Sequence, residues 1–126
     1  MRLAGFFYAP PLMRSLSLTS RRGMRHRPQM ARPTKLSEEA IRTRLSDLQG
    51  WTYEDGALRR NFEFPDFARA FGFMTTVALH AERADHHPDW SNVYNKVHVA
   101  LSTHDAGGVT DLDFDLAAVM DRLEPA

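Results

Sequence analysis

The chain has 126 residues, enough for one domain of ordinary size and too few for two. Its 43% hydrophobic and 25% charged residues are typical of a globular protein. It contains no cysteine, which excludes disulfides, thiolate zinc sites and a cysteine nucleophile. No apolar run of about 18 residues is present, so we expect no membrane-spanning helix.

The net charge is zero, but the charges are unevenly distributed. Residues 1–30 carry six arginines and no acidic residue, which leaves 10 basic against 16 acidic residues, a net charge of −6, in residues 31–126. This larger part of the chain is mildly acidic, so no basic face for direct binding of nucleic acid is expected.

Residues 1–35 are predicted to be a flexible or targeting N-terminal extension, and residues 36–126 to form the domain. The extension holds four of the seven prolines and shows no sustained helical or alternating period. Its arginine- and serine-rich, acid-free composition resembles a transit peptide. A disordered tail, or initiation at Met24 or Met30, explains the same composition. We therefore predict a cytoplasmic protein, or a mitochondrial or plastid one if residues 1–30 are a transit peptide.

The first predicted helix begins after Ser37, a good N-cap residue, and ends by Gly50. Its apolar residues have the spacing of one helical stripe: Ile41, Leu45 and Leu48. Residues 51–53 and 57–64 then flank Asp55-Gly56, a strong two-residue hairpin turn, and predict two antiparallel strands.

A long second helix is predicted over about residues 66–84. Its apolar residues recur every three or four positions: Phe67, Ala70, Phe71, Met74, Ala78 and Ala81. Phe73 and Val77 widen this stripe beyond one face. A helix that is apolar on more than one side usually contacts more than its own sheet, so we expect an oligomer interface here.

The rest of the chain predicts a second hairpin and a last helix. Val93-Tyr94 and residues 97–102 have the composition of strands that turn at Asn95-Lys96. Thr110 and Asp113 resemble a helix capping box with Asp in place of Glu. The order helix, strand, strand, helix, strand, strand, helix predicts an α+β two-layer domain with a four-stranded antiparallel sheet and three helices on one face.

Four of the six histidines lie between residues 86 and 113. Histidine clusters suggest proton transfer or metal ligation. No metal is predicted, because the adjacent side chains of His86 and His87 point opposite ways on an extended chain and no helical ligand pair is present. No nucleophile elbow or glycine-rich phosphate loop is found either. General acid–base catalysis remains, with Asp105 or Asp113 orienting an imidazole. Purely structural histidines, and a purely capping Asp113, are the alternatives.

The spacing Glu82-x-x-x-His86-His87-Pro88, followed by Tyr94, His104 and Asp113, resembles the signature of the pterin-4a-carbinolamine dehydratase family. The likeness spans residues 36–124. It implies a lyase, a 4a-hydroxytetrahydrobiopterin dehydratase, that converts a 4a-hydroxytetrahydropterin to quinonoid dihydropterin and water in tetrahydrobiopterin recycling. It further implies no metal or organic cofactor, and a homodimer or homotetramer assembled through the long helix around Phe73 and Val77.

The resemblance also implies which residues form the active site. His86 and His104 would transfer protons, His87 would bind the pterin, and Asp113 would orient His104. Which histidine is the acid and which the base stays open. Further substrate-binding residues are expected beside these: Asp85, Trp90, Ser102, Thr103 and Asp105. Trp90 in particular is expected to pack against the flat pterin ring.

Two other functions remain compatible with the sequence. Some members of the family double as dimerisation cofactors of a homeodomain transcription factor, through the same helical surface, so the chain can instead be an interaction module. A scaffold that binds a pterin without converting it is the third hypothesis. The hydroxylase that supplies the substrate, the side chain of the pterin, and the choice between dimer and tetramer are left undecided by the sequence.

Overall fold

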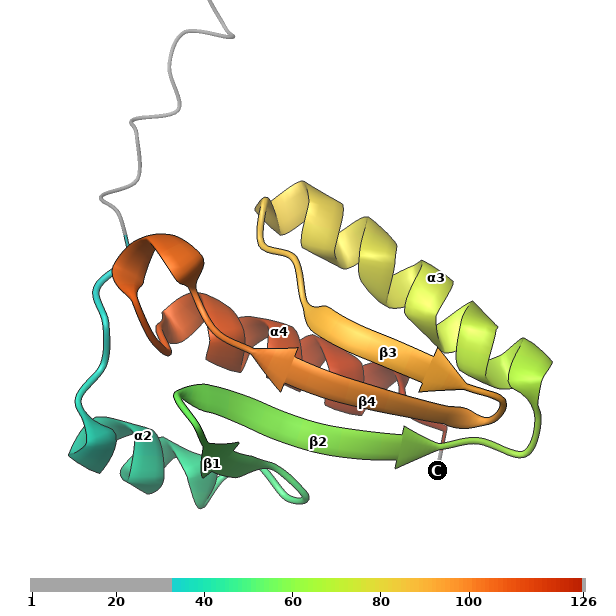
Figure 1. Ribbon diagram of the computed structural model, residues 1–126, viewed down its shortest axis with the longest axis horizontal. Coiled ribbons are helices and arrows are strands. Elements are labelled where there is room, and N and C mark those ends of the chain that lie inside the picture. Colours follow the sequence, from blue (N-terminus) through green and yellow to red (C-terminus); the bar gives the residue numbers. More distant parts are fainter. Residues whose placement is uncertain (1–32, 126) are drawn as a thin grey trace, which may run out of the picture. The chain divides into compact units, whose positions relative to one another are not determined.

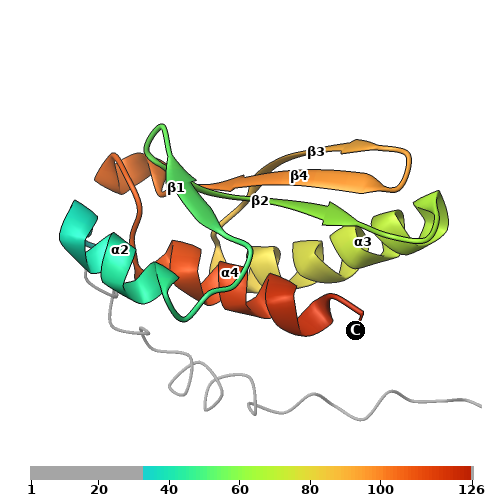
Figure 2. The same cartoon turned by 90° about the horizontal axis from the view of Figure 1, so that it is seen from below.

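A computed structural model describes residues 33–125 of the chain, and the predictions made for residues 1–32 fall outside this range. The strands β1 (Thr52–Glu54), β2 (Ala57–Glu63), β3 (Asp89–Val93) and β4 (Lys96–Leu101) form one antiparallel sheet in the order β1-β2-β4-β3. The helices α2 (Glu38–Leu45), α3 (Phe67–Ala84) and α4 (Asp111–Leu123) cover one face of it (Figures 1 and 2). The predicted fold class is confirmed.

The first hairpin follows the predicted turn chemistry. Asp55 and Gly56 both have positive φ, 50° and 73°, as a two-residue hairpin turn requires. Helix α2 is capped by Ser37, whose Oγ accepts from the amide of Ala40. It ends at Leu45, earlier than expected, and the Ser46 hydroxyl donates to the carbonyl of Thr43 instead of extending the helix.

The interpretation of Phe73 and Val77 as an outward extension of the α3 stripe was wrong. They belong to the face that packs on the sheet, together with Ala70 and Ala81. The Phe73 ring lies 4.9 Å from the ring of Phe62, between centroids. The large apolar side chains that α3 exposes are Phe67, Phe71 and Leu79. Periodicity gave two apolar stripes, and it does not tell which of them faces the sheet.

The second hairpin is longer than expected. Strand β3 begins at Asp89, directly after Pro88, and the turn falls at Tyr94, where φ is 51°. The Asn92 side-chain amide closes the turn by donating to the carbonyls of Tyr94 and Lys96. The first part of this strand was not predicted because its residues are mostly polar, which is common where a strand lies at a sheet edge.

Strand β4 lies between β2 and β3 and turns Val97, Val99 and Leu101 into the core. Arg60 interrupts the alternation of β2 because it also lies on the helix side, where its guanidinium pairs with Asp121 and Glu124 of the α4 end. In residues 33–125, no helix has the length and apolar character needed to cross a bilayer.

Candidate active site

The predicted site residues gather at the end of the sheet where α3 stops, β3 starts, β4 stops and α4 starts (Figure 1). Asp85 ends α3 in the left-handed conformation, with φ 49°. Its amide donates back to the carbonyls of Ala81 and Glu82, and the amide of His86 donates to Ala81. This cap reverses the chain, so that His86 and His87 lie in the short connection between the end of α3 and the start of β3.

On the side of the sheet that faces the helices, four side chains form a hydrogen-bonded cluster, which we call the inner network: His86, Thr103, Thr110 and Asp113. His86 Nε2 lies 2.5 Å from Asp113 Oδ1. Asp113 Oδ2 accepts from the Thr103 hydroxyl and from the Thr110 amide, both at 2.9 Å. Asp113 is fully buried, and His86 is 7% exposed.

The bonding of Asp113 fixes the tautomer of His86. A carboxylate that accepts from a hydroxyl and an amide is an acceptor for the imidazole too, so His86 Nε2–H donates. In the neutral ring, Nδ1 then carries the lone pair. Three donors compensate the cost of burying this carboxylate. Asp113 also closes the capping box of α4, where the helix dipole favours a negative charge.

A second group of polar side chains faces the open side of the sheet. In both chain segments that reach the site, residues 86–93 and 96–103, more buried residues alternate with exposed ones. Asp89 pairs with Ala100 in the antiparallel ladder. Continuing this register by two residues sets exposed His87 opposite exposed Ser102, whereas His86 and Thr103 point inward.

His104 opens a short 3₁₀ helix, η1 (His104–Ala106), and is exposed. We call His87, Ser102 and His104 the outer group. The Nε2 atom of His87 lies 3.3 Å from Glu82 Oε2, in a pair whose side chains are 57% and 80% exposed. Among the residues that the structure describes, no three histidines and carboxylates come close enough together to hold a metal ion.

The loop that carries His104 is fixed at both of its ends. The amide of Thr103 donates to the carbonyl of Gly108 at 2.8 Å. The amide of Leu36, which precedes α2, donates to the carbonyl of Val109 at 2.8 Å. Lys35 lies so close that a Cβ added at Gly108 would be 2.8 Å from its Cε atom. Residues before α2 therefore support the His104 loop.

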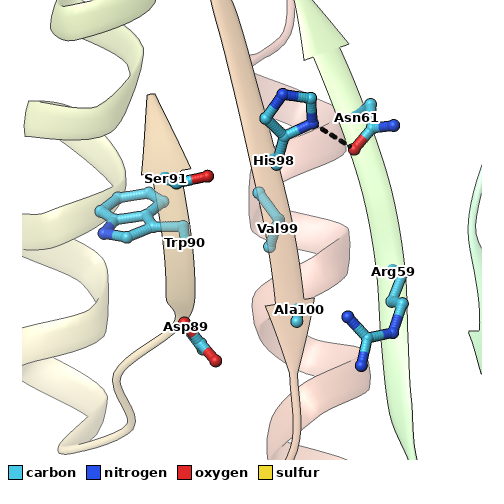
Figure 3. Close-up of a pocket in the computed structure, with 8 residues that line it drawn as sticks. All are labelled: Arg59, Asn61, Asp89, Trp90, Ser91, His98, Val99 and Ala100. Atoms are coloured by element: carbon cyan, nitrogen blue, oxygen red, sulfur yellow. Dashed lines mark hydrogen bonds between the residues drawn. The ribbon is translucent and has the colours of Figure 1, made fainter. Parts of the chain in front are cut away.

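The structure differs from the expected roles in three places. Asp113 bonds to His86 and not to His104. The Thr103 hydroxyl is within hydrogen-bond distance of Asp113 and Thr110, so it is already bonded within the inner network. Trp90 is half-buried against the core, and its indole is directed toward α3 (Figure 3).

Two partners of the site were missed at the level of sequence. Thr110 was considered only as a helix cap, and Glu82 was noted in the signature without a role. The capping pattern of Thr110 and Asp113 was the available signal for the first, because it fixes where the Asp113 carboxylate lies. Asp85 and Asp105, expected to line the site, are both exposed next to the histidines.

Comparisons with known proteins place the chain in a family. Residues 34–123 match the family model of pterin 4 alpha carbinolamine dehydratase. A protein of Bradyrhizobium sp. (strain ORS 278) named "Putative pterin-4-alpha-carbinolamine dehydratase" is 57% identical over 94 residues, which cover 73% of this chain and 94% of that protein. A solved structure from Brucella melitensis, described as a transcriptional coactivator/pterin dehydratase, is 45% identical and has a TM-score of 0.71, covering 73% of this chain and all of that one.

A more distant solved structure shares the fold alone. It is a pterin dehydratase-like protein identified as a RuBisCO assembly factor, with a TM-score of 0.50 and 19% identity, covering 60% of this chain and 88% of that one. The fold and the assembled signature thus define a protein of the pterin dehydratase class. The chain belongs to the pterin 4 alpha carbinolamine dehydratase family, which confirms the predicted family and enzyme class.

Proposed function

We propose that this protein dehydrates a 4a-hydroxytetrahydropterin to quinonoid dihydropterin and water, by histidine acid–base catalysis and as a step in tetrahydrobiopterin recycling. One observation carries the proposal: within the family match over residues 34–123, the signature residues His86 and Asp113 lie within hydrogen-bond distance of each other at one end of the sheet. No cofactor is needed in this scheme, because imidazoles alone can move both protons.

The reaction needs a base and an acid. The C4a–O bond breaks, the departing hydroxide takes a proton from the acid, and a ring N–H gives its proton to the base. We assign the base to His86, because a carboxylate that holds one imidazole nitrogen as a donor leaves the other as a lone pair. Asp113 then stabilises the imidazolium that forms.

We assign the acid to His104. It is exposed on η1, so it can regain its proton from water after each turnover. His87 is assigned to binding the pterin, with Glu82 beside it at 3.3 Å. The acid and the base then come from different segments, η1 and the α3–β3 connection, so each can be removed by a separate substitution.

Stopped-flow decay of a synthetic 4a-carbinolamine tests the proposal. We expect the purified protein to accelerate the decay, and the double variant with His86→Ala and His104→Ala to return it to the rate in buffer. His80→Gln, which alters a histidine of α3 outside the inner network and the outer group, is the matched control and should keep the rate. Tight pterin binding without acceleration would instead support the scaffold hypothesis.

A role as an interaction module is the second candidate. It is supported by the exposed Phe67 and Phe71 of α3, whose rings pack at 5.8 Å between centroids, and by the coactivator description of the Brucella relative. We also propose that these side chains join copies of the chain into a homodimer or homotetramer. Light scattering on the wild type and Phe71→Ser tests this assembly. Two results together would count against the interaction role. The wild type would be a homo-oligomer that Phe71→Ser dissociates, and a pull-down would retain no partner protein.

A further inference from the structure

The open face of the sheet has a hollow of about 220 Å³ beside the candidate active site (Figure 3). Two rows of residues cross it from β2 over β4 to β3: Arg59, Ala100 and Asp89 in one, and Asn61, His98 and Ser91 in the other. The small side chain of Ala100 fills little of the space between Arg59 and Asp89, which leaves the surface hollow there.

Arg59 and Asp89 point toward one another across Ala100 (Figure 3), and none of the ion pairs among the described residues joins them. Two strand spacings separate their backbones, on the order of 10 Å. Arg59 is held in place by its Nε–H, which donates to the carbonyl of Glu54 at 3.0 Å. The ends of its guanidinium and the Asp89 carboxylate are therefore a separated donor and acceptor, with room for a small group between them.

The second row adds a further polar edge. His98 Nδ1 lies 2.8 Å from the side-chain oxygen of Asn61, so Nδ1–H is the donor and Nε2 stays available in the neutral ring. The Ser91 hydroxyl is directed toward His98 (Figure 3). The two rows thus place polar side chains along the hollow, and the methyl group of Ala100 lies between Arg59 and Asp89. Trp90 and Val99 also line the hollow.

The hollow and the outer group of the site lie on the same face of the sheet, two residues apart along the strands. His87 precedes Asp89 by two residues and Ser102 follows Ala100 by two, on the same face of the sheet. Two residues of strand span roughly 7 Å. In the substrate, C6 is bonded to N5, the neighbour of the reacting C4a. A three-carbon substituent on C6 can therefore reach the hollow while the ring lies at His87 and His104.

We propose that this hollow is a subsite for a hydroxylated side chain on C6 of the pterin, an inference that rests on the proposed dehydratase function. Asp89 accepts hydrogen bonds from the hydroxyls, and the guanidinium of Arg59 donates to them. A substituent without hydroxyls leaves both charged groups without a partner in the complex, which disfavours it. Arg59, Ala100 and Asp89 then determine which C6 side chain the protein prefers in its substrate.

The test compares two substrates in stopped flow: 4a-hydroxytetrahydrobiopterin, which carries a dihydroxypropyl group on C6, and its 6-methyl analogue. We expect the wild type to favour the first by about three- to tenfold in kcat/KM, the effect of one or two hydrogen bonds. In Asp89→Ala, Arg59→Met and Ala100→Ile, which fills the hollow with a residue suited to a strand, the ratio should fall toward one.

Glu63→Gln is the matched control, because Glu63 faces the same side of the sheet one row further along, opposite Lys96. It should keep the wild-type ratio. A wild-type ratio near one, or variants that keep the wild-type preference, would overturn the subsite and leave the dehydratase function intact. If neither substrate is accelerated, the proposed function fails instead. In that case, calorimetry on the wild type can still test the subsite by comparing the Kd values of 7,8-dihydrobiopterin and 6-methyl-7,8-dihydropterin. Equal Kd values would overturn the subsite.

Discussion

The two sides of the sheet at the candidate site are built on opposite principles. The inner network is buried, and each polar side chain in it has a partner. The outer group is exposed, and within residues 33–125 its one hydrogen bond between side chains is the loose pair of His87 with Glu82. The inner network and the outer group are neighbours in the sequence, because the side chain of His86 points inward and that of His87 points outward. The inner network holds the proposed base His86 in a fixed geometry, and the outer group is open to solvent.

This contrast predicts that substitutions on the two sides fail differently. Removing a buried partner leaves other buried polar groups unsatisfied, so stability suffers first. Removing an exposed imidazole leaves the fold intact, so activity suffers alone. Measuring the free energy of unfolding and the turnover rate on the same variants therefore tells the two sides apart.

Asp113→Ala should have the largest effect. It leaves His86, Thr103 and the amide of Thr110 without their shared acceptor, and it removes a helix cap. We expect a loss of about 3–5 kcal/mol in the free energy of unfolding, measured in urea. Asp113→Asn keeps the shape and one acceptor, so it should lose less stability. A variant Asp113→Ala as stable as the wild type would contradict the inner network.

His104→Ala should reduce turnover by at least about 100-fold, the typical contribution of a general acid. Its free energy of unfolding should stay within about 0.5 kcal/mol of the wild type, because the side chain is exposed. Stopped flow and urea denaturation measure the two quantities. If stability falls as steeply as in Asp113→Ala, the assignment of His104 to the reactive side is wrong.

Thr103→Val should cost about 1–3 kcal/mol of stability, because it keeps the shape but leaves Asp113 and Thr110 without their hydroxyl partner. Thr103→Ser restores the hydroxyl and should recover most of the loss. Denaturation midpoints of the pair give the comparison. Equal stability of the Val and Ser variants would mean that the hydroxyl contributes nothing.

Glu82→Gln should have the smallest effect, because its partner His87 is itself more than half exposed. We expect the free energy of unfolding to change by less than about 0.5 kcal/mol, as for other exposed ion pairs. Turnover should change by a few-fold at most, through the KM for the pterin. A large drop in kcat with an unchanged KM would instead place Glu82 in the chemistry.

Much of the fold could be predicted from local chemistry. The Asp55-Gly56 turn, the Ser37 cap and the Thr110–Asp113 capping box involve residues close in sequence, so their spacing carries the information. The face of α3 could not be predicted in the same way. Periodicity shows which residues share a stripe, but the choice between the stripes of Phe71 and Phe73 depends on what packs against them.

The candidate site divides in the same way. The spacing of the signature selected three histidines and Asp113 as candidates, and the structure brings His86 and Asp113 together. The spacing could not show that Asp113 reaches His86 rather than His104, because that depends on how two segments 27 residues apart meet in space. Trp90 was assigned to the pterin ring from its chemistry alone, whereas its place in β3 turns it toward α3.

The hydrogen bond from Leu36 to Val109 couples the start of the domain to the loop of His104. We therefore expect movement of the chain just before α2 to disturb the loop that carries His104. A protease cut or a bulky fusion placed between residues 33 and 36 should loosen that loop and slow turnover while the sheet and its helices stay folded.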